Sequence, residues 1–483
     1  MRCPDPSCAG GNPGAEPVIC ATISALTDIA EREESLLTKR LPILSQAVSN
    51  QIFDALAPYA GAAADPLGNS PVPPPPSILP LSEEIAGLSR FWAAARTTYG
   101  FWGRVTPEQW DIAYQETLER LLAAGPLPTT EYYDWLEVFA ACLGDGHTGI
   151  LPPAALYQRR SRPGLRLDWV GDQLVVADSA LIPPGTILTE VDGEPIGQVY
   201  DRVARTVSAS TPHDLAAKVA DRFLRRDPGT SIQLAGRQAD GQFGQWTVTA
   251  DYAEDVIQPV TAQLVTPDIT HIDLPHFRDA APVVAFDDTF PHFNGIRGII
   301  IDLRSNRGGS SGWGLQILSR LIHAEIPLWR ARIPVTAPVL ESWGLPARWE
   351  LQPSAGTLAP HTGLTRFDGP VAVLTSPRTY SAAEDFVVAF RAAQRGVVIG
   401  QTTGGSSGQP AFFPMPGGGW GFVCGVWNLA PDGTEFVQTG LVPDIVAEPS
   451  LHDYVVGRDG ALEQAVAWIE QVSSDRPQAG PTG

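Results

Sequence analysis

A short apolar run that leads directly into an amphipathic helix marks the sequence between positions 371 and 394. Val371–Thr375 is apolar and contains β-branched residues, which is typical of a buried strand. From Ala382 onward apolar residues recur at helical spacing, and Glu384 and Asp385 occupy the first turn, where the helix dipole favours acids. The pattern predicts a strand, a tight turn and a helix, with Ser381 at or next to the helix N-cap.

Two interpretations of Ser381 follow from this position. Most serines that precede a helix only cap it. The other interpretation is a nucleophile, because its hydroxyl would lie beside unpaired backbone N–H groups that can hold an oxyanion. The local sequence does not decide between a cap and a nucleophile. Other parts of the chain are needed for that decision.

Strands and helices alternate from about Val260 onward, which predicts an α/β domain whose main strands are buried on both faces. Glycine-rich turns, 305–312 and 402–408, follow two of these strands. Such junctions lie at the carboxyl edge of an open α/β sheet, where ligand sites form. The Gly308-Gly309 pair is therefore expected at the same edge as Ser381, as an oxyanion hole or as a simple tight turn.

Upstream of this domain the patterning divides the chain into several parts. The run of four prolines is typical of a semi-rigid linker. Three helical segments, 83–99, 107–124 and 131–142, precede His147, and strand-like runs dominate the next ninety or so residues. The predicted parts are a helical segment (1–60), a proline-rich linker (61–80), a helical domain (81–150), a β-rich module (160–255), the α/β domain (256–472) and a frayed tail (473–483).

Composition excludes several classes of function. The chain has 483 residues, 43% of them hydrophobic, and a net charge of −20, which argues against binding to nucleic acids or anionic membranes. No apolar run is long enough for a membrane span. The spacing of the five cysteines supports neither zinc ligation nor a disulfide framework. No metal or other cofactor is therefore expected. The N-terminus shows no apolar signal region, which favours the cytoplasm.

A serine nucleophile needs a base within hydrogen-bond reach. Lys39 and Lys218 are both far upstream of the α/β domain, so a Ser-Lys pair has no obvious member. Of the eight histidines, His147 is the best candidate, because it follows a Gly-Asp-Gly turn at a helix end where the backbone is tightly directed.

Taken together, five segments resemble the tail-specific (C-terminal processing) serine peptidases, in the branch that includes the tricorn core protease and the retinoid-binding-protein-like repeats. The segments are DLRSNRGG (302–309), TYSAAE (379–384), GQTTGG (400–405), GLVPDI (440–445) and DGHT (145–148). The resemblance implies a ClpP/crotonase-like α/β core and a PDZ-like module over about 165–252. It also implies a peptide or protein substrate, and the sequence leaves open whether the chain forms a homo-oligomer.

The same resemblance implies roles for individual residues. Ser381 would be the nucleophile and His147 the general base, and the amides of Ala382 and of Gly308 or Gly309 would form the oxyanion hole. In the carboxy-terminal processing branch a lysine follows the glycine-rich turn after the nucleophile, and Ser406 stands at about that position here, which favours the Ser-His branch. Glu435 and Gln438 are the candidates to orient His147, and the sequence leaves open that no residue does so.

Two other functions fit the same fold. A non-catalytic carrier of an apolar ligand would use the scaffold without the chemistry, because fold does not fix function. A crotonase-like acyl-transfer enzyme would use the same amides, but the chain shows no signature for coenzyme A. The presence of both Ser381 and His147 favours the peptidase.

Overall fold

The computed structural model describes residues 74–157, 160–253, 258–289, 295–335, 348–352, 355–363 and 367–474. All of them belong to one compact unit, Ser70–Gly483. The predicted helical segment 1–60 lies outside the described residues, as do most of the linker and the tail from 475 onward. None of the helices in the described ranges is long and apolar enough to cross a membrane.

The α/β core is built on a six-stranded sheet in the order β10-β11-β12-β17-β18-β22. All neighbouring pairs are parallel except the edge pair β10–β11. The strands are β10 (Thr261–Thr266), β11 (Ile269–Asp273), β12 (Gly298–Asp302), β17 (Val371–Thr375), β18 (Gly396–Gly400) and β22 (Ile445–Val446). Every residue of β12 and β17 is buried, as expected for strands covered on both faces.

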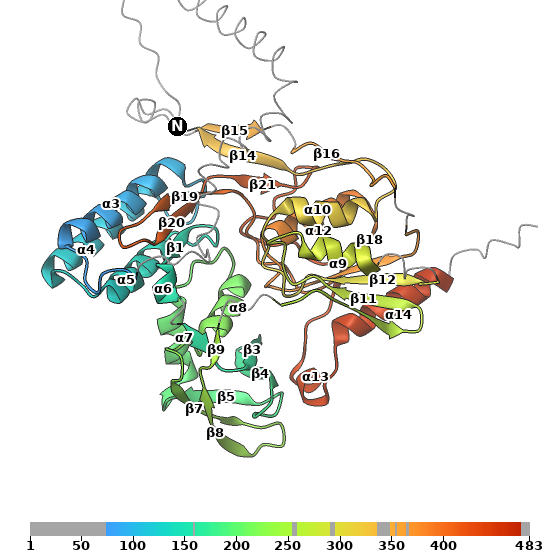
Figure 1. Ribbon diagram of the computed structural model, residues 1–483, viewed down its shortest axis with the longest axis horizontal. Helices are drawn as coiled ribbons and strands as arrows, with labels where there is room; N and C mark the ends of the chain where they lie inside the picture. Colours follow the sequence, from blue (N-terminus) through green and yellow to red (C-terminus); the bar gives the residue numbers. More distant parts are fainter. Residues whose placement is uncertain are drawn as a thin grey trace, which may run out of the picture. The chain divides into compact units, whose positions relative to one another are not determined.

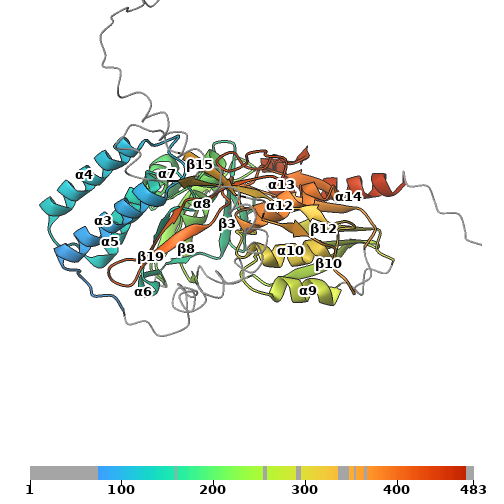
Figure 2. The same cartoon turned by 90° about the horizontal axis from the view of Figure 1, so that it is seen from above.

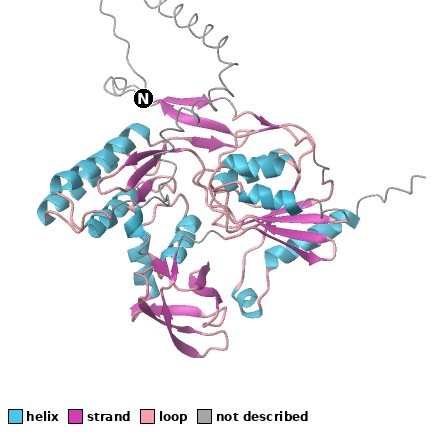
Figure 3. Ribbon diagram, viewed as in Figure 1, coloured by secondary structure: helices cyan, strands magenta, loops and turns pink. Residues whose placement is uncertain are grey.

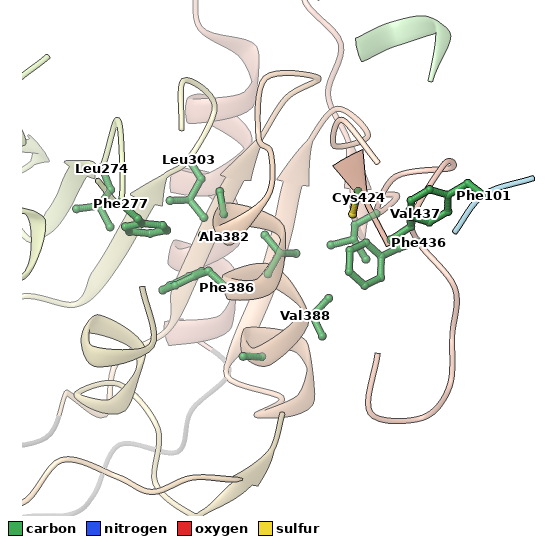
Figure 4. Packing of buried hydrophobic residues seen from close by; sticks show 14 of the residues in the cluster. Phe101, Leu274, Phe277, Leu303, Ala382, Phe386, Val388, Cys424, Phe436 and Val437 are labelled. Atoms are coloured by element: carbon green, nitrogen blue, oxygen red, sulfur yellow. The ribbon is translucent and has the colours of Figure 1, made fainter. Parts of the chain in front are cut away.

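Helices cover the two faces of this sheet (Figure 1). One face packs against α9 (Ala281–Thr289), α10 (Ser311–Ser319) and α12 (Ala382–Ala392), and the other against α14 (Gly460–Ser474). Phe386 of α12 faces Phe277 from the segment after β11, with ring centroids 6.1 Å apart (Figure 4). This packing fixes the start of α12, where Ser381 lies, against the core.

Three helices form the region that carries His147, and they lie together when seen from above (Figure 2). They are α3 (Leu81–Thr98), α4 (Pro107–Ala124) and α5 (Thr129–Ala141), within two residues of the predicted bounds. Thr106 caps α4 in a reciprocal capping box with Gln109. The rings of Trp110 and Phe139 stack at 4.1 Å between α4 and α5.

This helical region also packs on a hairpin from the distant C-terminal part of the chain. The hairpin strands β19 (Pro410–Pro414) and β20 (Trp420–Cys424) form a sheet with β1 (Gly149–Leu151). Phe91 of α3 meets Phe413 of β19 at 5.9 Å. The hairpin was not predicted from the sequence, and it ties the strand that follows His147 to the α/β part of the chain.

The β-rich module has a hydrophobic core of its own and is mostly strand (Figure 3). Its main strands are β3 (Leu165–Val170), β4 (Gln173–Ser179), β5 (Ile187–Val191), β7 (Ser231–Arg237) and β8 (Phe243–Thr249), with helices α7 (Ile196–Ala204) and α8 (Pro212–Arg222). The sequence did not predict β7 or α7.

Arg378, three residues before Ser381, joins the module to the core. It contacts Asp168 at 2.6 Å, the Leu167 carbonyl at 3.0 Å and Asp221 of α8 at 2.9 Å. The remaining short elements are α6 (Ala154–Tyr157), β2 (Ser161–Arg162), β6 (Glu194–Pro195), β9 (Tyr252–Ala253), β13 (Ile326–Pro327), β14 (Arg330–Val335), β15 (Arg348–Gln352), β16 (Thr357–Leu358), β21 (Trp427–Leu429) and α13 (Leu451–Val456).

Candidate active site

Ser381 lies between β17 and α12, with φ at +58° and ψ at −124°. A non-glycine residue with positive φ is held in a strained conformation, and such residues gather at functional sites. Two hydrogen bonds hold the strained residue, because its backbone N–H donates to the Ser406 carbonyl at 3.1 Å and to Glu384 Oε2 at 3.2 Å. The turn directs the hydroxyl toward the helical region, where Ser381 Oγ lies 2.9 Å from His147 Nε2.

His147 is buried between the core and the helical region. Its Nδ1 lies 2.6 Å from Ser406 Oγ, and its ring stacks on Tyr380 with centroids 4.9 Å apart. With the proton on Nδ1 donated to Ser406, Nε2 is free to accept the Ser381 proton. Burial, with the nearby Lys218 charge as a smaller cause, lowers the pKa of His147 to about 3. The imidazole is therefore neutral near pH 7, as a general base must be.

Glu384 organises the turns around the serine. Its carboxylate accepts hydrogen bonds from four donors, namely Ser381 N, Thr403 Oγ1, Gly405 N and Ser406 N, at 2.6 to 3.2 Å. Burial raises the pKa of Glu384 to about 7, and these hydrogen bonds act in the opposite direction. One carboxylate thus links the Ser381 junction to the turn that carries Ser406.

The three residues predicted for the oxyanion hole differ in what their amides do. The Gly308 N–H already donates to Asn306 Oδ1 at 2.8 Å. No described residue accepts a hydrogen bond from the Gly309 or the Ala382 N–H. Gly308 instead permits close approach, because its φ is +91° and a Cβ there would lie 2.7 Å from Ser381 Cβ. The geometry therefore favours Gly309 and Ala382 as the two donors.

A short segment of the β-rich module holds both turns of the site. Ser210 Oγ accepts from Gly146 N at 2.9 Å and donates to Asp145 Oδ1 at 3.1 Å, on the turn that carries His147. Thr211 Oγ1 donates to the Gly404 carbonyl at 3.0 Å, and His213 Nε2 donates to the Thr403 carbonyl at 2.7 Å. We call residues 210–213 the bridging segment, because they touch the His147 turn and the Ser406 turn at once.

The residues expected to orient His147 do not contact it. Glu435 is exposed and forms an ion pair with Arg332 at 2.7 Å. Gln438 contacts Arg104 through its backbone carbonyl at 3.0 Å, and its buried side-chain Nε2 has no partner among the described residues. Ser406 takes this place instead, because its backbone N–H is fixed by Glu384 and its hydroxyl points at Nδ1.

Sequence reasoning named Ser406 only as the position of a missing lysine, and it treated Glu384 only as a first-turn acid. It did not name Ser210. The spacing of Ser381 and Glu384, three residues apart across a helix start, could have pointed to the backbone contact of Glu384. Nothing in the sequence around Ser210 marks its contact with the His147 turn.

Residues 268–447 match the model of peptidase family S41. Among solved structures, mature CPAF is similar with a TM-score of 0.60 and 15% identity, over 81% of this chain and 96% of that chain. CPAF complexed with lactacystin gives a TM-score of 0.58 at 15% identity, over 81% and 98%. At these identities the likeness concerns the fold alone. No curated protein sequence matches the chain at a significant level.

The α/β fold and the family match define the class of this protein as a serine-type peptidase. Within that class, residues 268–447 of its α/β core match peptidase family S41, in agreement with the family predicted from the sequence.

Proposed function

We propose that this chain hydrolyses peptide bonds with Ser381 as the nucleophile, His147 as the general base, and the amides of Gly309 and Ala382 as the oxyanion hole. The observation that carries the proposal is the 2.9 Å contact between Ser381 Oγ and His147 Nε2. It joins two residues 234 positions apart, and a helix cap alone would not require it. The pair also meets next to two amides that lack acceptors among the described residues.

The reaction follows from this geometry. His147 Nε2 takes the Ser381 proton as the oxygen attacks the carbonyl carbon, and the negative charge that develops on the carbonyl oxygen is held by the two amides. The imidazolium then gives the proton to the leaving amine as the C–N bond breaks. A water molecule repeats the sequence on the acyl-enzyme, which releases the second product and restores Ser381.

Ser406 acts on this cycle through His147. Its hydroxyl accepts from Nδ1–H, and so it favours the tautomer in which Nε2 is the acceptor. A hydroxyl carries no charge, so it orients the imidazole without the electrostatic support that a carboxylate would give to the imidazolium. Glu384 holds Ser406 in place by accepting a hydrogen bond from its backbone N–H at 2.9 Å.

A fluorophosphonate probe tests the proposal. Wild-type protein should be labelled covalently, Ser381→Ala should not be labelled, and His147→Ala should react far more slowly. Peptide hydrolysis should fall by at least about 10³-fold in each variant, because the two residues act as a unit. Circular dichroism and thermal melting would show that both variants fold. Labelling that survives in Ser381→Ala, or folded wild-type protein that is not labelled, contradicts the proposal and favours the ligand carrier.

A further inference from the structure

A cavity of about 180 Å³ lies beside the proposed catalytic centre. Three of its lining residues, Gly146, Arg307 and Tyr380, directly precede His147, Gly308 and Ser381 in the chain. The cavity is therefore bordered by the immediate neighbours of the proposed base, the glycine turn and the proposed nucleophile. A substrate group bonded close to the scissile peptide is the natural occupant of such a space.

The wall of this cavity carries three basic side chains, Lys218, Arg222 and Arg307. Lys218 contacts Asp214 at 2.9 Å, and Asp214 Oδ2 also lies next to Gly146 of the wall. Arg307 forms an ion pair with Asp221, which does not line the cavity.

Glu137 is the acid on the same wall, and Arg160 holds it at 3.2 Å. The charges that face the cavity are thus mostly positive. In a partly buried site such charges act more strongly on an anion than they would in water.

Tyr380 adds a hydrogen-bond donor at the same place. Tyr380 is only 8% exposed. Its hydroxyl lies near the Ser406 side chain but in poor hydrogen-bond geometry, and no other described residue pairs with it. A Cβ added to Gly146 would lie 2.2 Å from the Tyr380 oxygen, 2.8 Å from Lys218 Nζ and 3.1 Å from Asp214 Oδ2, the carboxylate that pairs with Lys218. The hydroxyl and the ammonium group therefore flank the same glycine on the cavity wall. A buried hydroxyl without a partner is costly, and a ligand acceptor would satisfy it.

We propose that this cavity is a substrate subsite for a carboxylate, carried by an aspartate or glutamate side chain close to the scissile bond. The inference rests on the proposed function. A guanidinium fork matches the geometry of a carboxylate. The apolar walls, Ile150 and Phe422, suit the methylene groups that carry it. A free C-terminal carboxylate of a short substrate has the same chemistry, and the experiment separates these two sources.

Cleavage of a peptide library derived from a whole proteome tests the subsite. Mass spectrometry of the products should show aspartate and glutamate enriched over asparagine and glutamine at one position next to the cleaved bond, by at least about tenfold. Arg222→Gln should abolish this enrichment. Arg202→Gln removes an exposed arginine of the same module that pairs with Glu194, and it should leave the enrichment unchanged.

Amidated and unmodified peptides identify the source of the carboxylate. If the acidic preference depends on a free C-terminus of the substrate and Arg222→Gln abolishes it, the cavity binds the C-terminal carboxylate of the substrate instead of an acidic side chain. No acidic preference in wild type, or one that persists in Arg222→Gln, overturns the proposal.

Binding to Ser381→Ala protein separates this inference from the proposed function. If no peptide is cleaved at all, the same library is passed over immobilised Ser381→Ala and Ser381→Ala/Arg222→Gln protein. Retention of acidic peptides by the first protein alone supports the subsite even though the hydrolase proposal has failed. Equal retention by both proteins overturns the subsite.

Discussion

The hydrogen bonds that hold the Ser381 backbone come from the α/β core alone, whereas three separate parts of the chain hold His147. On the nucleophile side, β17, the turn and α12 follow each other within 22 residues, and Glu384 lies only three residues from Ser381. On the base side, the turn that carries His147 follows α5 and contacts Ser210 of the β-rich module. The imidazole itself contacts Ser406, which lies 259 residues further along the chain.

This difference separates local from tertiary control of the site. The nucleophile side depends on backbone geometry that forms with the core, and it should fail only when the core is damaged. The position of His147 depends on contacts between the helical region, the β-rich module and the α/β core. Loss of one of these contacts should lower the rate of peptide hydrolysis while the protein stays folded. The predictions below test this contrast.

Glu384→Gln should have the largest effect, because it acts on both sides. An amide has one accepting end, so two of the four donors to Glu384 would lose their acceptor. We expect a loss of about 2–5 kcal/mol of unfolding free energy and a fall of about 10²-fold in kcat. Chemical denaturation and peptide hydrolysis measure the two effects.

Asp385→Asn is the matched control for this change. Asp385 is also buried, but its carboxylate accepts from Ser311, Ser407 and Asn428. It contacts the Ser381 junction only through its backbone N–H, which the substitution keeps. It should lose comparable stability and much less activity. If the two variants lose the same activity at the same stability, Glu384 has no special role in positioning.

Ser210→Ala should weaken the base side alone. It removes the acceptor of Gly146 N–H and the donor to Asp145. We expect kcat to fall by about tenfold with little change in KM, because a poorly held His147 affects the chemical step more than binding. Fluorophosphonate labelling should slow in proportion.

Ser179→Ala makes a comparison within the same module, since Ser179 accepts from the backbone of Leu181 and Ile182 far from the site. It should leave both rates unchanged. Equal losses in the two serine variants would mean that the module acts only through its general stability.

The pH profile should show the smallest effect. Burial first, and the Lys218 charge second, lower the pKa of His147 to about 3, so the acid limb of kcat/KM should lie below the ordinary histidine value of about 6.5. Lys218→Met should move that limb to higher pH by less than about one unit, since burial remains. Lys218→Arg keeps the charge and should not move it.

The same pKa shift has a consequence for stability. Between about pH 6.5 and pH 3 the unfolded chain binds a proton at His147 that the native protein does not, so stability should fall as the pH falls through this window. An acid limb near pH 7 that Lys218→Met leaves in place would assign it to Glu384, whose pKa is raised to about 7, and would contradict the histidine assignment.

Local patterns predicted those parts of the molecule that depend on local sequence. The bounds of β17 and α4 agree with the prediction residue for residue, because apolar periodicity and the capping residues of α4 are local signals. The family resemblance added His147 and Ser381 as a pair, and the structure brings them together.

The contacts that reach across the chain could not be predicted in this way. Ser406 is one hydroxyl in a glycine-rich turn, and only the tertiary fold places it on His147. Glu435 lies near the right place in the sequence, but its side chain turns outward to Arg332. Phe413 of the β19–β20 hairpin packs on Phe91 of α3, more than 300 residues upstream, and no local signal marks that contact.

The bridging segment also bears on how small a working version of this protein could be made. A fragment that begins at residue 258 would keep the six-stranded sheet, the strained serine and both unpaired amides. It would lack His147, and restoring the helical region alone would leave Asp145 and Gly146 without their hydrogen bonds to Ser210. A variant with a shortened or exchanged β-rich module would therefore also have a changed reaction centre. This holds although neither the nucleophile nor the base belongs to that module.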